Sequence, residues 1–571
     1  MWLSKASKRK RSAWRCSCSA PSGRKAICSA GRSRYRSSAR ATNRARSPEG
    51  GLDHRPARID CFQPVIAAAR LIPPQRQRIC TSKIATGRRG VSEIASPAAS
   101  TVPLTPDICV IGHGPGGLAV ATAAALFGVR IVLVRHGGSE LPPNEGARGQ
   151  ALRAAAGQAR TVAGAASFGI AVNAGQIDYA RVRAHLDQVA ARSATNDSDE
   201  RLTALGVLVL KGEARFQNRH QLAVGGSVVR ARRFVIATGS LPAQLSIPGL
   251  ADLPCLTEDS VFDLAKRPDR LLVLGGTAAA IELAQAMRAL GSEVALIARE
   301  GLLPDEDQEA VGVLRRALLG DGIALHESRP ILRAESHRQR PRLVLGGNST
   351  IDGTHLLVAS GRTPNIAGLE LDLAGARSDD AGVIVDASLR TANRRIYAIG
   401  ACAGGAAAGM APGHAAQHQA GLVLRNALFR LPVRFRPEQV PRTVHGRPEL
   451  ASVGLSETQA RAQGALRVLR WPYAESGLAQ AERQAEGLIK LMTDRKGTIL
   501  GVVIAGAQAA ELIAPWVLAV QKRMNVRDMA GLVAPSQSLS EISQRAALSF
   551  QAPLAAKPGI RRLIGFLRRF G

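Results

Sequence analysis

The sequence predicts an α/β fold with two Rossmann-like dinucleotide-binding units and a separate C-terminal α+β domain. Three observations support this prediction. An apolar strand runs directly into a glycine-rich turn and an alanine-rich helix after Pro106, and the same order recurs from residue 271. From about Pro441 the pattern changes to separated strands and helices. The length of 571 residues and the 46% content of hydrophobic residues suit several domains with buried cores.

The first 104 residues form a basic leader. The net charge of the chain is +32, and its first 100 residues hold 22 Lys and Arg against 4 Asp and Glu. A segment so rich in Ser and Arg and so poor in large aliphatic residues is predicted to be disordered. Three interpretations stay open: a start codon placed too far upstream, which we favour, a transit-peptide-like targeting segment, and a nucleic-acid-binding tail. Nucleic-acid binding is the least favoured, because no aromatic residues interleave with the charges.

The two Rossmann-like units are recognised by their order of strand, turn, helix and strand. The first comprises strand 107–112, helix 118–127 and strand 130–134, and the second comprises strand 271–275, helix 279–290 and strand 294–297. Each spans about 30 residues, as a parallel βαβ crossover requires. The apolar stretch 108–134 is long enough to cross a bilayer, but its glycines, Pro115 and Arg130 favour the strand-turn-helix-strand interpretation. No membrane span is therefore predicted.

The first unit carries a Gly-x-Gly-x-x-Gly turn formed by Gly112, Gly114 and Gly117. The first glycine allows the tight turn, the second lets the backbone approach a pyrophosphate, and the third permits close packing of helix and strand. The phosphates would lie at the positive end of the helix. An acidic residue for a ribose hydroxyl is expected at the end of the second strand, but Arg135 stands there.

The second unit has a poorer glycine turn. It begins with Gly275 and Gly276, but Thr277 and Ala280 occupy the second and third glycine positions of the triplet. Arg299 follows the second strand, where an NAD-preferring site would place a carboxylate. An arginine can pair with a 2′-phosphate, so NADPH is favoured over NADH.

Three further strands end in glycine, and a mixed region follows them. Strands 234–239, 356–361 and 396–400 are predicted to be buried and to stop at a ligand, and the C-terminal region contains strand 499–504 and helices 509–522 and 540–547. This last region is predicted to be a separate α+β domain.

Several segments together resemble one family. The stretches "VIGHGPGGLAVATAAALFG", "RRFVIATGSLPAQLSIPGL", "LLVASGRTPNIAGLEL", "RTANRRIYAIG" and "PELASVGLSETQARAQG" occur in the order found in dihydrolipoamide dehydrogenases and mercuric reductases. The chain resembles this class I pyridine nucleotide-disulfide oxidoreductase family over nearly all of residues 106–550. The resemblance implies FAD in the first unit, NAD(P) in the second, and a homodimer formed through the C-terminal domain.

The resemblance also implies a domain order and a set of cofactor-binding residues. The expected order is a leader (1–104), an FAD-binding domain (105–266), an NAD(P)-binding domain (267–355), the return of the FAD-binding domain (356–438), a dimerisation domain (439–552) and a basic amphipathic tail (553–571). The expected cofactor-binding residues are Gly112, Gly114, Gly116, Gly117, Thr238, Gly239, Gly275, Gly276, Glu282, Arg299, Gly361, Arg362 and Gly400.

The chain departs from the family where the family's disulfide chemistry resides. Family members carry a Cys-x4-Cys pair after the first unit, but Pro142 and Ala147 stand at those positions, and the following lysine is missing too. Near the C-terminus Ser536 replaces the histidine of an acid-base pair, while its partner Glu541 is retained. No residue is therefore assigned a catalytic role in dithiol chemistry.

A further departure weakens the expected flavin site, and no other thiol replaces the pair. Gly400 is followed by Ala401, where the family has an aspartate for the ribityl chain of the flavin. Cys109 is expected to be a small core residue. Cys402 is a single thiol and cannot form a dithiol-disulfide couple. His414 and His418 are expected to be structural.

The eight cysteines also bear on compartment and metal binding. Five lie in the leader, and only Cys109, Cys255 and Cys402 belong to the remaining chain. Three scattered thiols offer no zinc spacing and no disulfide framework, so a reducing cytoplasmic compartment and no metal site are expected.

The tail after Pro558 is amphipathic. Ile560, Leu563, Ile564 and Leu567 fall on one helical face, with arginines elsewhere. Such a helix could lie on an acidic membrane surface. Packing against the preceding domain is the favoured interpretation.

Two hypotheses for the function follow. A flavin between two nucleotide sites needs no cysteine to accept hydride from NADPH and pass electrons to oxygen, a quinone or another small diffusible acceptor. The first hypothesis is such an FAD-dependent oxidoreductase without disulfide reductase activity. The alternative is a non-enzymatic dimeric scaffold or nucleotide sensor that has lost FAD, which the combined losses at Arg135, Pro142, Ala147 and Ala401 would favour.

Overall fold

The computed structural model describes residues 102–136, 145–172, 176–347, 349–409, 413–555 and 557–570. The predictions for most of the leader and for Pro142 lie outside these residues. The described chain forms the α/β fold that the sequence predicts, with two parallel sheets and a C-terminal antiparallel sheet.

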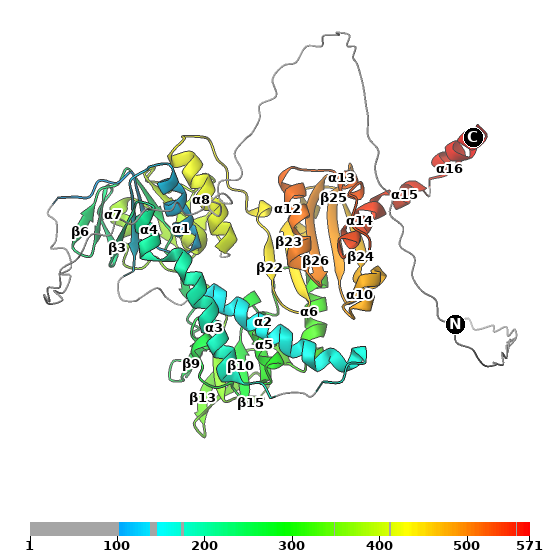
Figure 1. Cartoon of the computed structure of the whole chain (residues 1–571), viewed down its shortest axis with the longest axis horizontal. Coiled ribbons are helices and arrows are strands. Elements are labelled where there is room, and N and C mark those ends of the chain that lie inside the picture. Colours follow the sequence, from blue (N-terminus) through cyan, green and yellow to red (C-terminus); the bar gives the residue numbers. More distant parts are fainter. Residues whose placement is uncertain are drawn as a thin grey trace, which may run out of the picture. The chain divides into compact units, whose positions relative to one another are not determined.

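The first parallel sheet contains five strands in the order β20-β7-β1-β2-β3. Its strands are β1 (Ile108–Ile111), β2 (Ile131–Arg135), β3 (Val207–Lys211), β7 (Arg233–Ile236) and β20 (Ile396–Ala398). Helix α1 (Pro115–Leu126) connects β1 to β2 and packs against α8 (Gly413–Ala427) (Figure 1). All pairings in this sheet are parallel, so the carboxyl ends of β20, β7, β1 and β2 meet at one edge.

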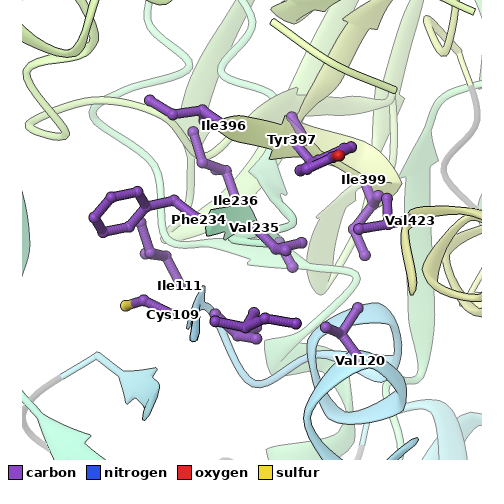
Figure 2. Packing of buried hydrophobic residues seen from close by; sticks show 14 of the residues in the cluster. Cys109, Ile111, Val120, Phe234, Val235, Ile236, Ile396, Tyr397, Ile399 and Val423 are labelled. Carbon is purple, nitrogen blue, oxygen red and sulfur yellow. The ribbon is translucent and has the colours of Figure 1, made fainter. Parts of the chain in front are cut away.

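The core of this domain lies on both faces of the sheet. Figure 2 shows Phe234 of β7 near Ile396 of β20, with Cys109 of β1 and Val120 of α1 in the same cluster. These side chains are fully buried or nearly so. The near-continuous apolar sequence of each strand follows from burial on both faces, as expected of a parallel sheet.

The second parallel sheet has the order β12-β11-β10-β16-β9. Its strands are β9 (Cys255–Thr257), β10 (Arg270–Leu274), β11 (Glu293–Ala298), β12 (Ala324–Glu327) and β16 (His355–Val358). Helix α5 (Ala278–Ala289) connects β10 to β11, and α6 (Gln308–Gly320) follows them. Helix α2 (Glu145–Gly164) packs against both α5 and α3 (Tyr179–Ala194), and α4 (Asp199–Ala204) leads into β3.

Small sheets and a short helix complete these two domains. They comprise β4 (Ala214–Asn218), β5 (Gln221–Val224), β6 (Ser227–Val229), β8 (Ser240–Pro242), β13 (Ile331–His337), β14 (Arg340–Leu345), β15 (Thr350–Asp352), β17 (Arg362–Pro364), α7 (Leu371–Ala374), β18 (Ser378–Asp379), β19 (Gly382–Val385) and β21 (Ala403–Gly405).

The C-terminal domain is built on an antiparallel sheet in the order β22-β23-β26-β25-β24. Its strands are β22 (Arg442–Val444), β23 (Glu449–Gly454), β24 (Leu466–Pro472), β25 (Leu488–Asp494) and β26 (Ile499–Gly506), and its helices are α9 (Glu457–Ala462), α10 (Gly477–Ala481), α11 (Ala509–Leu512), α12 (Ala514–Gln521), α13 (Val526–Ala530) and α14 (Ser540–Leu548). Fully buried Trp516 joins α12 to α14 by donating its indole N–H to the Ser543 hydroxyl at 3.1 Å.

Two helices end the chain, and they correct one prediction. They are α15 (Ala552–Ala555) and α16 (Pro558–Leu567). The favoured prediction that the tail packs against the preceding domain is wrong, because no residue of α16 is buried. Amphipathic spacing identifies an apolar face but does not specify the partner that covers it. Within the described residues, no helix combines the length and the apolar character needed to cross a bilayer.

Candidate functional site

The glycine turn between β1 and α1 is as tight as its motif predicts. Gly112 has φ of +109°, and a Cβ there would lie 2.3 Å from the Ala237 carbonyl oxygen of the segment after β7. A Cβ on Gly117 would lie 2.0 Å from the Gly112 carbonyl oxygen. Real Cβ atoms cannot approach so closely, so both positions require glycine for the turn and for helix packing.

Gly114 differs from these two glycines because its surroundings are open. It is the N-cap of α1, and a Cβ there would meet no atom within 4 Å. No side chain caps the helix at this position. The first turn of α1 therefore has open space at its N-cap and no capping side chain that competes for its backbone N–H groups, which is an arrangement that can bind a phosphate.

Gly116 has a packing role in the structure. A Cβ there would lie 2.9 Å from the Cβ of Ala416, so glycine allows α1 and α8 to approach closely. Its predicted part in cofactor binding stays a prediction.

The carboxyl ends of β7 and β20 supply polar groups with incomplete hydrogen bonding. The Thr238 hydroxyl oxygen is buried and makes no hydrogen bond among the described residues. Gly400 donates its N–H to the Gln419 side-chain carbonyl at 2.7 Å, whereas the buried amide nitrogen of Gln419 has no partner in the described chain. Gly239 has φ of +72° and open space at its Cβ position. Buried polar groups normally find partners, so these orphaned groups and open glycines fit a polar ligand such as the flavin nucleotide.

A carboxylate does reach the end of β2, although the sequence places Arg135 there. Arg135 is only 5% exposed and forms an ion pair with Asp199, the first residue of α4. Lys211, the register partner of Arg135 on β3, approaches the same carboxylate at 3.1 Å. Burial opposes ionisation of Asp199, but hydrogen bonds from Lys211 and Arg135 lower the pKa of its carboxyl group overall.

Asp199 also lies close to the glycine turn. The pKa of His113, which stands between Gly112 and Gly114, is lowered by burial and by the charge of Arg135, while the charge of Asp199 opposes this effect. The carboxylate therefore pairs with the end of β2, where an acidic residue for the ribose was expected, and is near enough to the turn to act electrostatically on His113. Sequence reasoning missed Asp199 because 64 residues separate it from Arg135.

The second glycine turn is also tight but more closed. A Cβ on Gly275 would lie 2.0 Å from the Ala359 carbonyl oxygen, and one on Gly276 would lie 2.1 Å from the Gly301 carbonyl oxygen. Thr277 replaces the open glycine and caps α5 by accepting from the Ala280 N–H at 3.2 Å. This hydroxyl fills the place that stays open at Gly114, so the second turn leaves less room for a phosphate than the first.

Arg299 lies at the carboxyl end of β11, beside the second turn. Its side chain is 54% exposed and pairs with Glu300 at 2.8 Å. Gly275 donates its N–H to Ile297 of the same strand at 2.9 Å, which places the end of β11 next to the turn. An exposed guanidinium in this position can reach a phosphate on a ribose.

Glu282 connects three elements. Its carboxylate pairs with Arg153 of α2 at 2.7 Å and accepts the backbone N–H of His445 at 2.8 Å. Both carboxylate oxygens are thus engaged by protein groups, and a role of Glu282 in cofactor binding stays a prediction.

Gly361 and Arg362 lie where the chain crosses back between the two nucleotide domains. Gly361 has φ of +121° and open space at its Cβ position. Arg362 pairs with Asp259 at 2.9 Å and with Glu258 at 3.2 Å, and it donates to the Ser240 carbonyl oxygen at 2.9 Å. Strand β17, which begins at Arg362, also pairs with β8. Arg362 therefore stabilises the connection between the two nucleotide domains.

The thiols of the described residues are poorly suited to redox chemistry. Burial raises the pKa of Cys109, Cys255 and Cys402, which disfavours the reactive thiolate. Cys402 donates to the Ile399 carbonyl oxygen at 3.2 Å and is fully buried. Ala147 is buried in α2 and offers no thiol either.

Glu541, the retained acidic residue near the C-terminus, is engaged by neighbouring protein groups. Glu541, in the first turn of α14, accepts the Gln537 N–H at 2.8 Å and pairs with Arg545 at 3.4 Å. Ser536 is exposed. His414 makes a 2.8 Å hydrogen bond with the Pro441 carbonyl oxygen, and burial lowers the pKa of His418.

Comparison with known proteins gives one consistent family. The model of the pyridine nucleotide-disulphide oxidoreductase family matches residues 106–420, and the model of that family's dimerisation domain matches residues 440–547. A dihydrolipoyl dehydrogenase from Thermus scotoductus is 35% identical over 458 residues, which cover 76% of this chain and 95% of the relative. A mercuric reductase from Bacillus cereus is 30% identical over 457 residues, covering 78% of this chain and 71% of the relative.

Solved structures agree with this assignment. LpdA from Mycobacterium tuberculosis superposes with a TM-score of 0.70 at 25% identity, covering 78% of this chain and 99% of that protein. The flavoprotein disulfide reductase RclA from Escherichia coli gives a TM-score of 0.68 at 23% identity over 77% of this chain and 99% of that protein, and it supports the fold alone. The chain therefore belongs to the pyridine nucleotide-disulphide oxidoreductase family, an FAD-dependent family of oxidoreductases that act with pyridine nucleotides.

Proposed function

We propose that the protein is a homodimeric, cytoplasmic FAD-dependent oxidoreductase that takes electrons from NADPH and passes them to a small non-dithiol acceptor such as a quinone or oxygen. One observation carries this proposal: both glycine turns keep their tight geometry, whereas burial raises the pKa of every thiol of the described residues. When bound, FAD supplies hydride acceptance and onward electron transfer without any cysteine.

In this proposal the chain holds FAD through groups at the carboxyl ends of the first sheet. The open N-terminus of α1 at Gly114 holds the pyrophosphate. The Thr238 hydroxyl and the Gln419 amide, which lack hydrogen-bond partners among the described residues, bind the flavin end of the cofactor. These two groups stand in for the carboxylate that Ala401 lacks.

Asp199 takes the place of the missing acidic residue at position 135. Its ionised carboxylate, held by Arg135 and Lys211, accepts a hydrogen bond from a ribose hydroxyl of FAD. Asp199→Asn should weaken FAD binding about tenfold, because a charge-assisted hydrogen bond is replaced by a neutral one.

Flavin fluorescence on titrating the apoprotein measures this effect. Glu200→Gln on the same helix turn is the matched control and should bind FAD as the unmodified protein does. If Asp199→Asn lowers the melting temperature but binds FAD normally, Asp199 only neutralises Arg135, and its proposed role is wrong.

The choice of acceptor rests on what the dithiol positions contain. The sequence has no cysteine between Gly137 and Leu152, and Ser536 is an exposed hydroxyl in place of a ring that could exchange protons with a dithiol. The relatives named dihydrolipoyl dehydrogenase and mercuric reductase suggest the substrates lipoamide and mercuric ion for comparison. We propose that this chain reduces neither.

The purified full chain tests the proposal in two steps. A stoichiometric yellow flavin, and NADPH oxidation with a soluble quinone but not with lipoamide, glutathione disulfide or mercuric ion, are the expected results. Rapid reduction of lipoamide would contradict the proposal. The buried Arg135 and the missing carboxylate at Ala401 favour a second candidate, a scaffold without FAD. Failure to take up FAD on reconstitution would support that candidate instead.

A further inference from the structure

Helix α16 leaves its apolar side uncovered. The side chains of Leu563, Ile564, Phe566 and Leu567 are each more than half exposed, and Phe570 just after the helix is 73% exposed. Single exposed apolar residues are ordinary on protein surfaces, but a contiguous group of this size marks an interaction site. The helix lies at the C-terminal end of the chain, drawn in red in Figure 1.

The apolar and basic residues of the tail are segregated around the helix. At 100° per residue, the apolar residues Ile560, Leu563, Ile564, Phe566, Leu567 and Phe570 fall on one side. The arginines Arg561, Arg562, Arg568 and Arg569 fall on the opposite side. The rings of Phe566 and Phe570 contact each other edge to face, with centroids 5.0 Å apart, which extends the apolar side to the end of the chain.

The tail is also strongly and uniformly positive. Residues 557–570 contain Lys557 and four arginines but no Asp or Glu. A surface that covers this helix must therefore offer both an apolar layer and negative charge. The boundary between the headgroups and acyl chains of an anionic bilayer presents the two together over the length of a helix.

We propose that α16 docks the protein on an anionic lipid surface. The apolar side enters the boundary between headgroups and acyl chains, and the arginines lie among the lipid phosphates. The helix lies on the bilayer and does not cross it.

Other occupants of this side fit the tail less well. A second copy of the helix would bring five positive charges against five, which opposes pairing. Nucleic acid would satisfy the arginines but would leave six large apolar side chains without a partner. In a homodimer two tails would bind together, so that moderate affinity of each gives firm attachment.

Docking has a consequence for the acceptor, and that consequence, unlike the docking itself, rests on the proposed function. A protein held on the bilayer lies where a lipid-soluble quinone is dissolved. Among the acceptors considered for this chain, a membrane quinone is therefore the one that the tail favours.

Co-sedimentation of the full chain with vesicles tests the docking without any measurement of activity. Vesicles of phosphatidylcholine with phosphatidylglycerol are compared with vesicles of phosphatidylcholine alone. We expect the anionic vesicles to bind at least about tenfold more protein, and chains ending at Lys557 to lose this binding. Both chains keep the basic leader, so the difference between them reports the tail.

A double substitution isolates the apolar contribution to binding. Leu563→Ser with Leu567→Ser keeps every charge and should reduce vesicle binding about tenfold, because apolar area drives insertion. Gly565→Ser, which lies among the arginines on the opposite side of the helix, is the matched control and should bind normally. Equal melting temperatures of all variants would show that the exposed tail changes do not unfold the protein.

Several results would overturn the proposal. One is equal vesicle binding by the truncated and full chains. Another is unchanged binding by the double serine variant, which would indicate attraction by charge alone without insertion of the apolar side. Concentration-dependent association of full chains beyond a dimer, lost on truncation and unaffected by vesicles, would instead show that the tail binds a second copy.

Discussion

At the scale of single residues, two glycines of the same turn have different roles: one is needed for packing, and the other leaves space for a cofactor. A Cβ on Gly117 would lie 2.0 Å from the Gly112 carbonyl oxygen, whereas a Cβ on Gly114 would meet nothing within 4 Å. Gly114 has φ of −68°, which any residue adopts. Gly117 is therefore required by packing, whereas Gly114 is free to contact a ligand.

Alanine substitutions at these positions should differ in their effects. Gly117→Ala should lower the free energy of unfolding by about 1–3 kcal/mol through overpacking. Gly114→Ala should leave the melting temperature of the apoprotein unchanged but weaken FAD binding about tenfold, because its methyl group enters the space proposed for the pyrophosphate. Thermal melting and flavin fluorescence measure the two effects. Unchanged FAD affinity in Gly114→Ala would place the pyrophosphate elsewhere.

Arg299 decides the choice of nicotinamide cofactor in the proposed function. Arg299→Gln should reduce kcat/KM for NADPH about tenfold and leave kcat/KM for NADH unchanged, because only NADPH carries a 2′-phosphate. Steady-state assays with both cofactors measure this change. Arg333→Gln is a matched control, since Arg333 is similarly exposed and pairs with a nearby glutamate. Equal losses with both cofactors would remove Arg299 from the specificity site.

Residue patterns predicted what depends on short spacing and missed what depends on long-range contacts. The turn glycines stand within six residues of one another, so their motif was visible in the sequence. The partner of Arg135 lies 64 residues away in the sequence, and no motif near Arg135 predicts the pairing. The orphaned hydroxyl of Thr238 likewise depends on burial, which the strand pattern alone does not give.

At the scale of secondary structure, elements bounded by glycine or strong apolar runs matched their predictions. Helix 279–290 corresponds to α5, and strand 499–504 lies within β26. The predicted helix 509–522 is divided into α11 and α12, with Pro515 at the start of the second helix. A proline lacks the N–H that a continuous helix needs there. Helix α2 was not predicted, because its buried face consists largely of alanine.

An ion cluster links the C-terminal sheet to helix α6 and makes stability depend on pH. Lys490 is 4% exposed and lies within 2.7 Å of both Asp307 and Glu457. Hydrogen bonds from Lys490 and Arg461 lower the pKa of Glu457 to about 2. Because the folded pKa is below the ordinary value, this contribution to stability is present above about pH 4.5 and is lost as the pH falls toward 2.

Replacement of this glutamate should flatten the acid limb of the stability curve. The melting temperature of the unmodified protein should fall between about pH 4.5 and 2, and Glu457→Gln should show a smaller fall over the same interval. Differential scanning calorimetry at several pH values measures both curves. Glu475→Gln, in the same domain but outside the cluster, is the control. Parallel curves for Glu457→Gln and the unmodified protein would show that other carboxyl groups control acid stability.

At the scale of the whole molecule, two parallel sheets bring two glycine turns to the carboxyl ends of their strands. Arg362 stabilises the connection between the two nucleotide domains. Glu282 links the second nucleotide domain to α2, and Lys490 links the C-terminal sheet to the same domain. This organisation was predictable, because repeated strand-turn-helix-strand units determine it. The surroundings of the amphipathic tail were not predictable, because spacing identifies an apolar face but not the surface that covers it.

The central claim is that NADPH reduces a bound flavin in a protein that has no redox disulfide. Flavin and a disulfide together would take up four electrons, whereas flavin alone takes up two. The most direct measurement is an anaerobic titration of the purified protein with NADPH, followed by the visible flavin absorption. The account predicts complete bleaching at one equivalent of NADPH per flavin. Uptake of a second equivalent would reveal another two-electron centre and contradict the claim, as would a flavin that NADPH leaves oxidised.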